Sequence, residues 1–503
     1  MATSAILAID QGTTNSKALL LDMAGRPIAR GQCAIECHYP RSGWVEQSGE
    51  ALFQSVLNAI NHCLDGHDDV AILALGISSQ RESAMAWSAR GGRPLGPCIS
   101  WQCRRSQPQC DALEKAGASS RVRELSGLPL DPLFSAAKFR WLLEHVGDEC
   151  AAADIRLGTV DSWLLWKLTG HRLHLTDLSN ASRTQLCDIH RGRWSAELTE
   201  LFGVPSRYLP EIRHSADDFG TTASGLGKLP AGIPILSIVG DSHAALLAQG
   251  GQDSRIVKAT YGTGSSVMTT TGDQPVEGRG LATTVAWETD QGRVYALEGN
   301  VTVSAAVLPW VARLLGLEGS VKRLGELARA ADPQGSEILV PAMVGLGAPR
   351  WVGGLSALMD GLPFRTGPAE IALAAFDSIV FQIRDVVDAM QAAGRTRDLP
   401  PLSALKADGG ASCNDWLMQR QAEALDLHVQ RARFAELSAL GAALLAGHQH
   451  GCWRAPDAFA AVLPEHDDFA PRDAAAFKPR HDQWLRAVAR TLHGTPAAVE
   501  EVS

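Results

Sequence analysis

Residues 5–21, AILAIDQGTTNSKALLL, are the stretch that decides the fold class. Two apolar runs, 5–9 and 17–21, have the composition of short buried strands, and a polar connection at 10–16 joins them. Because so short a connection cannot make a crossover, the two strands are predicted to pair as an antiparallel hairpin. The turn of this hairpin then carries glycine, threonine and charged residues together at the end of a sheet.

Outward from the hairpin, strand-like runs alternate with helical segments along the chain. Apolar residues recur every four positions from Leu52 to Leu64, which predicts a helix over 49–64 with Ser48 as its N-cap. The apolar run at 70–77 follows as a buried strand. This alternation is typical of an α/β protein whose sheets are covered by helices.

A similar pattern occurs again in the middle of the chain. Residues 234–239 predict a strand, Gly240-Asp241 a tight turn and 242–249 a helix. Strands at 257–261 and 267–271 then flank a glycine and threonine turn. This echo of the first hairpin, roughly 250 residues later, predicts two similar domains that meet near 245–255 with a cleft between them.

Composition and charge narrow the possible partners. The 503 residues include 46 basic and 55 acidic side chains, with a formal charge of −9 and no basic run of five or more. This balance lacks the electrostatic footprint of a protein that binds nucleic acid or an anionic membrane, so we expect a small-molecule partner. The apolar run at 5–9 is too short for a signal peptide or a span, which predicts a cytoplasmic protein. Homo-oligomer formation is left open.

The turn Asp10-Gln-Gly-Thr-Thr-Asn-Ser16, with Lys17 after it, has the donors of a phosphate cradle. Gly12 permits close approach of an anion, the threonines donate hydrogen bonds, Lys17 adds positive charge, and Asp10 can hold a hydrated divalent cation. A polar hairpin turn explains the same residues equally well. The chain has no GxxxxGK[ST] loop, and Gly262-Thr-Gly264 lacks the third glycine of a dinucleotide fingerprint.

Three other places carry groups suited to chemistry, each with a plainer alternative. Residues 408–414, DGGASCN, lie between a strand and a helix and could hold a flat ligand, or simply start the helix. Asp241 could be a general base for a hydroxyl, although an N-cap is the commoner role of such a residue. Arg81 and Glu82, with Trp101, suit a polyhydroxylated ligand, or form a surface ion pair beside a core tryptophan.

Taken together, these segments resemble the FGGY carbohydrate kinases, and among them the glycerol kinases. The similarity extends over nearly the whole chain, through 8–17, 43–47, 80–82, 99–105, 127–145, 158–170, 175–189, 240–250, 260–265 and 408–419. The second signature of the family is met in full by 357–377. The first is met by 133–145 except at its opening position, where Leu133 stands.

The resemblance implies two ribonuclease-H-like α/β domains of the hexokinase and actin superfamily, with ATP, Mg²⁺ and substrate between them. Residues 1–248 would bind substrate and phosphate, 249–493 would bind the nucleotide, and 494–503 would be a tail. By position, the residues implied for ATP are Thr13, Thr14, Asn15, Lys17, Thr263, Gly410 and Asn414, and Asp10 would hold the metal through water. Arg81, Glu82, Trp101 and Asp241 would hold the substrate, a small polyol or sugar, with Asp241 as the base.

Departures from the glycerol kinases concern the substrate. Leu133 and Ser266 stand where those enzymes place an aromatic pair around glycerol, and Ser242 replaces a glutamine after the catalytic aspartate. We therefore expect a wider pocket, and a longer polyol or ketose such as erythritol or xylulose stays an alternative beside glycerol. A nucleotide-binding sensor without catalysis is a further alternative, against which the intact Asp10 and Asp241 argue.

Overall fold

The first sheet is built around the predicted hairpin in the computed structural model, which describes residues 3–146, 150–454 and 460–493. Strands β1 (Ser4–Gln11) and β2 (Asn15–Asp22) pair antiparallel with Asp10 opposite Lys17, so the hairpin is confirmed. Parallel strands β5 (Ala71–Ser79) and β13 (Ile235–Gly240) extend one edge, and β3 (Pro27–Ala34) extends the other. The strand order is β13-β5-β1-β2-β3.

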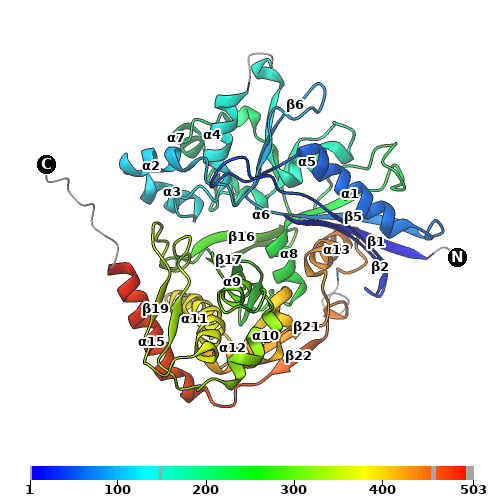
Figure 1. Cartoon of the computed structure of the whole chain (residues 1–503). Helices are drawn as coiled ribbons and strands as arrows, with labels where there is room; N and C mark the ends of the chain where they lie inside the picture. Colours follow the sequence, from blue (N-terminus) through cyan, green and yellow to red (C-terminus); the bar gives the residue numbers. More distant parts are fainter. Residues whose placement is uncertain (1–2, 147–149, 455–459, 494–503) are drawn as a thin grey trace.

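Helices α1 (Gly49–Leu64) and α5 (Val160–Leu168) cover one face of this sheet (Figure 1). The Ser48 side chain accepts a hydrogen bond from the Ala51 amide, which confirms the predicted N-cap of α1. Apolar residues of α1, such as Leu52, Val56 and Ile60, are fully buried against the sheet. The four-residue spacing in the sequence thus corresponds to the buried stripe of an amphipathic helix.

A smaller layer stands beyond α5 in the upper part of Figure 1. Its four strands run in the order β4-β7-β6-β8. Their bounds are β4 (Glu46–Gln47), β6 (Ala84–Ser88), β7 (Cys98–Ile99) and β8 (Ile155–Thr159). Its helices are α2 (Gln107–Lys115), α3 (Ser119–Ser126), α4 (Ser135–His145) and α7 (Ala196–Leu201). Short elements complete this half: β9 (Leu175–Asp177), α6 (Leu178–Ala181), β10 (Cys187–Asp188), β11 (Arg193–Trp194) and β12 (Glu211–Arg213).

The second sheet repeats the connectivity of the first. Strands β14 (Ile256–Tyr261) and β15 (Ser265–Gly272) form an antiparallel hairpin, and β20 (Ala404–Asp408) and β21 (His428–Ala432) extend it in parallel. The full order is β16-β17-β15-β14-β20-β21-β22, with β16 (Ala282–Thr289), β17 (Gly292–Val301) and β22 (His466–Phe469). The β14–β15 turn and the β20 end therefore correspond to the β1–β2 turn and the β5 end.

Helices cover the outer face of the second sheet, in the lower part of Figure 1. They are α9 (Val307–Leu314), α10 (Val321–Ala330), α11 (Pro368–Arg395), α12 (Asp415–Leu425) and α15 (Ala474–His493). Two short strands, β18 (Ile338–Val340) and β19 (Leu358–Asp360), pair beside them. The largest apolar cluster among the described residues fills this layer. The predicted tail, 494–503, lies outside the described residues.

Two helices, α8 (Asp241–Ala248) and α13 (Leu437–His450), lie between the two sheets (Figure 1). Their apolar residues share one cluster with Ile6 and Ala8 of the first sheet and with Met268 and Ala296 of the second. Helix α13 lies between β21 and β22 of the second sheet in sequence, yet it packs on β1, β5 and β13 of the first. The central helices therefore join the two halves through an apolar layer.

The start of α8 differs from the sequence-based expectation. A tight turn was expected at Gly240-Asp241, but β13 continues to Gly240 and α8 begins at Asp241 without a turn. The expectation was wrong because Gly240 is the N-cap of α8, and an N-cap residue commonly keeps the extended backbone of the preceding strand. In the part of the chain that the structure describes, none of the helices combines the length and the apolar character needed to span a membrane.

A buried histidine makes the stability of the first half depend on pH. His174 bonds the Leu157 carbonyl oxygen through Nε2 at 2.9 Å, and its ring lies edge-on to Trp87. Burial lowers the pKa of His174 from 6.5 to about 4. In the unfolded chain His174 is protonated below about pH 6.5, whereas in the folded chain it is protonated only below about pH 4. The free energy of unfolding therefore decreases as the pH falls from 6.5 to 4.

We predict that His174→Gln loses less stability between pH 7 and pH 5 than the wild type does. The difference should be about 2 kcal/mol, because each pKa unit corresponds to roughly 1.4 kcal/mol. Urea denaturation of both proteins at the two pH values measures it. An equal loss in the two proteins would contradict the assignment of this proton to His174.

Candidate active site

The β1–β2 turn holds the predicted phosphate residues in a closed loop. The Gly12 amide donates to the Asn15 carbonyl at 2.9 Å, which tightens the turn. Thr13 is anchored twice, because Gln47 donates to its carbonyl at 2.8 Å and the Trp101 indole N–H donates to its hydroxyl at 2.9 Å. Thr14 is exposed, and its hydroxyl accepts a hydrogen bond from the side-chain amide of Asn15 at 3.2 Å.

Asp10 lies near the end of β1, next to the phosphate turn. Its carboxylate accepts a hydrogen bond from the Ser78 hydroxyl at 3.1 Å. Burial, and then the negative charge of Asp241, raise the pKa of Asp10 to about 7, while Lys17 and Ser78 lower it in part. A divalent cation beside Asp10 would offset both the burial and the repulsion from Asp241, so the carboxylate fits a hydrated Mg²⁺.

The predicted nucleotide residues gather at the corresponding end of the second sheet. Thr263 lies exposed in the β14–β15 turn, and Gly410 lies exposed just after β20. Gly409 joins them: its φ is +87°, and a Cβ there would lie 2.6 Å from the Tyr261 carbonyl oxygen, so only glycine lets the two turns touch. These two turns therefore form one surface.

Asn414 follows this surface at the start of α12. Its side-chain oxygen accepts hydrogen bonds from the Trp416 and Leu417 amides at 3.1 and 3.2 Å, so it is the N-cap of the helix. The amide nitrogen of its side chain is the group that can face a ligand. The sequence left helix start and ligand site as alternatives here, and the observed cap allows both.

Arg81 and Asp241 meet at the end of the first sheet. Arg81 donates from Nε to Asp241 Oδ1 at 3.1 Å, and the Ser242 amide donates to the same oxygen at 2.6 Å. The Arg81 side chain is 7% exposed, whereas that of Asp241 is 33% exposed. The carboxylate of Asp241 is thus held from behind and remains open to a ligand.

The alternative of a surface ion pair between Arg81 and Glu82 is wrong. Both residues are buried, and Glu82 pairs with Arg183, whose Nε donates to Glu82 Oε1 at 2.7 Å. Glu82 also has a positive φ of 61°, which turns it sharply away from the path of the strand. Adjacent charges in the sequence therefore point to different partners.

Lys138 of α4 assembles the wall of the substrate residues. Its buried ammonium donates to the carbonyls of Glu82 at 3.3 Å and Phe134 at 3.2 Å, and also to that of Leu133. Burial lowers the pKa of Lys138 to about 8. The sequence reasoning missed this residue, although it lies inside the first family signature, 133–145.

Trp101 and Ser266 are the remaining residues predicted to bind substrate, and they come from two further segments. The Trp101 amide donates to the Ser83 hydroxyl at 3.0 Å, so the half-buried indole stands beside the Arg81–Glu82 loop. Ser266, on β15, donates to Glu298 Oε1 at 2.8 Å. Glu298 also bonds Arg81, which connects Ser266 to Asp241. Hydrogen bonds thus connect Arg81, Asp241, Ser242 and Ser266 directly or through Glu298, while Leu133 joins Glu82 through the carbonyl contacts of Lys138.

A chain of glutamines links this site with the phosphate turn. Gln80 donates from Nε2 to the side-chain oxygens of Gln11 and Gln47, each at 3.0 Å. Gln47 in turn holds Thr13. The sequence reasoning named none of these glutamines as site residues, although Gln47 and Gln80 lie within the matched stretches 43–47 and 80–82. Displacement of either loop would therefore disturb the other.

The arrangement suits transfer of a phosphoryl group to a hydroxyl. An accessible carboxylate lies near a second carboxylate fit for a metal ion, and a glycine and threonine turn with a lysine lies at the same sheet end. Phosphoryl transfer needs such positioning and charge, and little covalent chemistry from the protein.

Comparison with protein families agrees with this chemistry. Residues 5–248 match the FGGY family of carbohydrate kinases, N-terminal domain, and residues 257–450 match the C-terminal domain of the same family. The chain is 41% identical over 495 residues to the apulose kinase of Pectobacterium atrosepticum, covering 97% of this chain and 99% of that one. It is 43% identical over 493 residues to a glycerol kinase of Methylobacterium nodulans, covering 97% and 98%.

Solved structures agree as well. The Plasmodium falciparum glycerol kinase with ADP superposes with a TM-score of 0.90 at 27% identity, over 97% of this chain and 98% of that chain. A xylulose kinase from Lactobacillus acidophilus superposes with a TM-score of 0.87 at 20% identity, over 98% and 99%, and so shows the fold alone. The expected fold of two related α/β domains is confirmed. The chain therefore belongs to the FGGY family of carbohydrate kinases and is a phosphotransferase.

Proposed function

We propose that the protein transfers the γ-phosphoryl group of ATP to a hydroxyl of a small polyol or sugar, with Asp241 as the general base. The observation that carries this proposal is the open carboxylate of Asp241, held by Arg81 and by the Ser242 amide at the start of α8. Relatives that are named for glycerol and apulose support the same class of acceptor. The alternative of a non-catalytic nucleotide sensor has no need of an accessible carboxylate at this position.

The proposed transfer needs one bond to form, one to break and one proton to move. The acceptor oxygen attacks the γ-phosphorus, the bond from that phosphorus to the bridging oxygen of ADP breaks, and the acceptor proton passes to Asp241. Arg81 holds Asp241 throughout. Thr13, Thr14, Asn15 and Lys17 would bind the phosphates on one side, with Thr263, Gly410 and Asn414 on the other.

Asp10 would hold Mg²⁺ through water at the phosphate end of the site. When bound, the ion supplies positive charge to the phosphate oxygens. Asp10 itself fixes where that charge lies, because Ser78 and the paired strands β1, β2 and β5 hold its carboxylate in place. Lys17 lies opposite Asp10 in the hairpin, and its positive charge lowers the pKa of Asp10 in part.

The acceptor is proposed to be longer than glycerol. By the resemblance to glycerol kinases, Leu133 replaces an aromatic residue; it packs beside Phe134, and the Ser266 hydroxyl donates to Glu298. Ser242 is shorter than glutamine. Three smaller side chains would leave room for additional carbons and hydroxyls, so the tetritols, pentitols and pentuloses are better candidates than glycerol.

Asp241→Asn should abolish acceptor phosphorylation while ATP binding stays nearly intact. General-base catalysis contributes roughly 10²–10⁴-fold, and the nucleotide contacts come from other segments. Turnover is measured by acceptor-dependent ADP release, and ATP affinity by calorimetry. Asp253→Asn is the matched control, because this carboxylate pairs with Arg255 between α8 and β14. Turnover of Asp241→Asn within tenfold of the wild type would refute its role as base.

Asp10→Ala should weaken the use of Mg²⁺·ATP equally for every acceptor. The physical reason is that the carboxylate acts on the metal end of the nucleotide and not on the sugar. The dissociation constant of ATP, measured with and without Mg²⁺, should lose its dependence on the ion. A defect that is confined to one acceptor would place Asp10 in the substrate site.

The double variant Leu133→Tyr with Ser266→Phe should shift preference back toward glycerol. Each contact with a methylene group is worth roughly 1–3 kcal/mol of discrimination, and the new walls would fill the space that longer acceptors use. The kcat/KM values for glycerol, erythritol, pentitols, pentuloses and gluconate are compared for both proteins. If the wild type already prefers glycerol to every longer acceptor, the wider pocket is excluded and the protein acts as a glycerol kinase.

A further inference from the structure

We propose that Glu298, on β17, is the positioning residue through which the second half of the chain holds the charged side of the substrate site. The proposal rests on the proposed role of Asp241 and extends it to a residue outside every stretch that carries the family resemblance. Glu298 is completely buried. It therefore acts through other residues and does not touch the substrate.

Glu298 holds Arg81 by both ends of its guanidinium group. Arg81 donates from Nη1 to Oε2 at 3.1 Å and from Nη2 to Oε1 at 2.8 Å. A bidentate contact of this kind fixes the plane of the guanidinium as well as its distance from the carboxylate. Because Nε lies in the same plane, Glu298 sets the direction in which Arg81 donates to Asp241.

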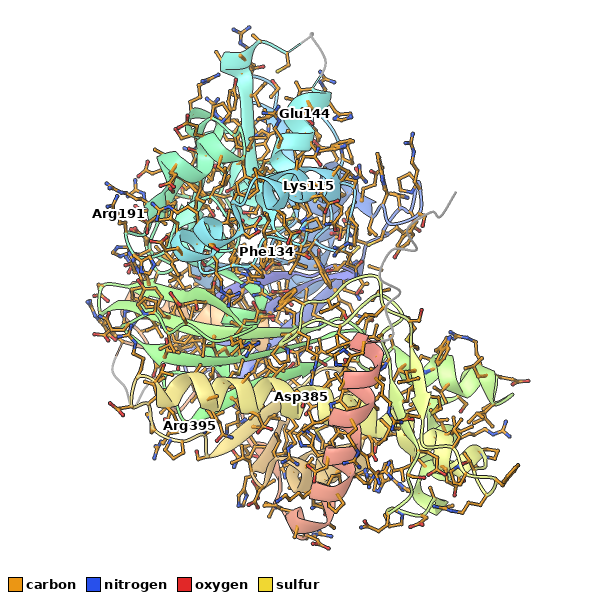
Figure 2. The ribbon with its side chains drawn as sticks, turned by 90° about the vertical axis from the view of Figure 1, so that its left-hand side faces the viewer. Lys115, Phe134, Glu144, Arg191, Asp385 and Arg395 are labelled. Carbon is orange, nitrogen blue, oxygen red and sulfur yellow. The ribbon has the colours of Figure 1, made fainter. Side chains whose placement is uncertain are left out.

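A second arginine connects Glu298 to the neighbouring substrate residue. Arg183 Nη2 lies 2.7 Å from Glu298 Oε2, and Arg183 Nε donates to Glu82. The guanidinium carbon of Arg183 lies 5.2 Å from the centre of the Phe134 ring. Phe134 packs against Ala282 of β16 and against Leu133, and Figure 2 shows it above the strands of the second sheet. Arg81 and Glu82 are therefore both held through one carboxylate.

The contacts of Glu298 join the two family domains. Arg81, Arg183 and Asp241 lie within 5–248, whereas Glu298 and its hydrogen-bond donor Ser266 lie within 257–450. A separate N-terminal half would thus carry Arg81 without the group that orients it. The substrate site is complete only when β15 and β17 lie against it.

Charge explains why a carboxylate is needed at this position. Burial alone would raise the pKa of Glu298, but the positive charges of Arg183 and Arg81 outweigh burial and hold it well below its usual range. His243 and Lys258 also face this cluster, and burial lowers the pKa of both. Without the charge of Glu298, the anions left near Arg81 are Glu82 and Asp241. Arg81 would then be drawn toward the base itself.

Glu298→Gln tests the proposal, because it keeps the shape and removes the charge and one acceptor. We expect kcat to fall about 100-fold, as a small misplacement of a catalytic group can cause, and the acceptor KM to rise about tenfold. The ATP dissociation constant should stay within about threefold of the wild type. Misfolding of part of the sample would lower the apparent kcat but leave the KM values for ATP and acceptor unchanged. A raised acceptor KM in the variant therefore indicates a loss of positioning and not of folded protein.

Asp385→Asn is the matched control. Asp385 is a buried carboxylate of the same domain, on α11, and is held by Arg350, His481 and Trp484. Figure 2 places it on α11, well below Phe134 in this view. The control should lower the melting temperature and leave kcat and the acceptor KM of the folded protein unchanged.

Two results would overturn the role of Glu298. One is a folded Glu298→Gln with wild-type kcat and acceptor KM, and the other is a loss that Asp385→Asn reproduces. If Glu298→Gln does not fold, Glu298→Asp decides, because it keeps the charge and shortens the reach to Arg81; wild-type kinetics in that variant refute the proposal. A wild type without acceptor-dependent ATP consumption would instead refute the proposed function.

Discussion

The close crossing of α8 and α13 between two sheets is the constraint on which the rest of the structure depends. A Cβ at Gly441 would overlap the Ala244 carbonyl oxygen, and one at Gly76 would lie 2.5 Å from the Ala442 carbonyl oxygen. The Ser237 hydroxyl donates to that same oxygen at 2.7 Å. Interiors packed this tightly transmit a displacement instead of absorbing it. Because α8 begins at Asp241, the packing of this layer sets the position of the proposed base.

Around that apolar layer, the site is assembled from charges that cannot be left unpaired. Burial of an unpartnered ion is costly, so the arginines at the interface between the halves require carboxylates, and the lysine of α4 requires carbonyls. Arg81 and Arg183 each contact two carboxylates that are distant in sequence, and Lys138 joins the start of its own helix to Glu82. The same requirement that stabilises the fold therefore also orients the groups that face the substrate.

Local patterns predicted the elements well and the partners of the charged residues poorly. The hairpin at 5–21, the helix at 49–64 and the second hairpin near 257–271 were all found from periodicity and turn residues. Glu298 could have been noticed only as a carboxylate within an apolar strand, a signal that does not say what it binds. Lys138 lay within a recognised signature, yet its partner Glu82 is 56 residues away, and no local pattern specifies that contact.

The sequence by itself determined the strands, the capped helix and the residue types at each turn, because these depend on contacts between residues close along the chain. It also identified the family, because many ordered motifs survive in one chain. Only the tertiary structure decided which charges meet. Arg81 is 160 residues from Asp241 and 217 from Glu298, and nothing in a strand or turn pattern ranks one distant partner above another. Those pairings are set by how the two sheets pack on α8 and α13, which is a property of the whole fold.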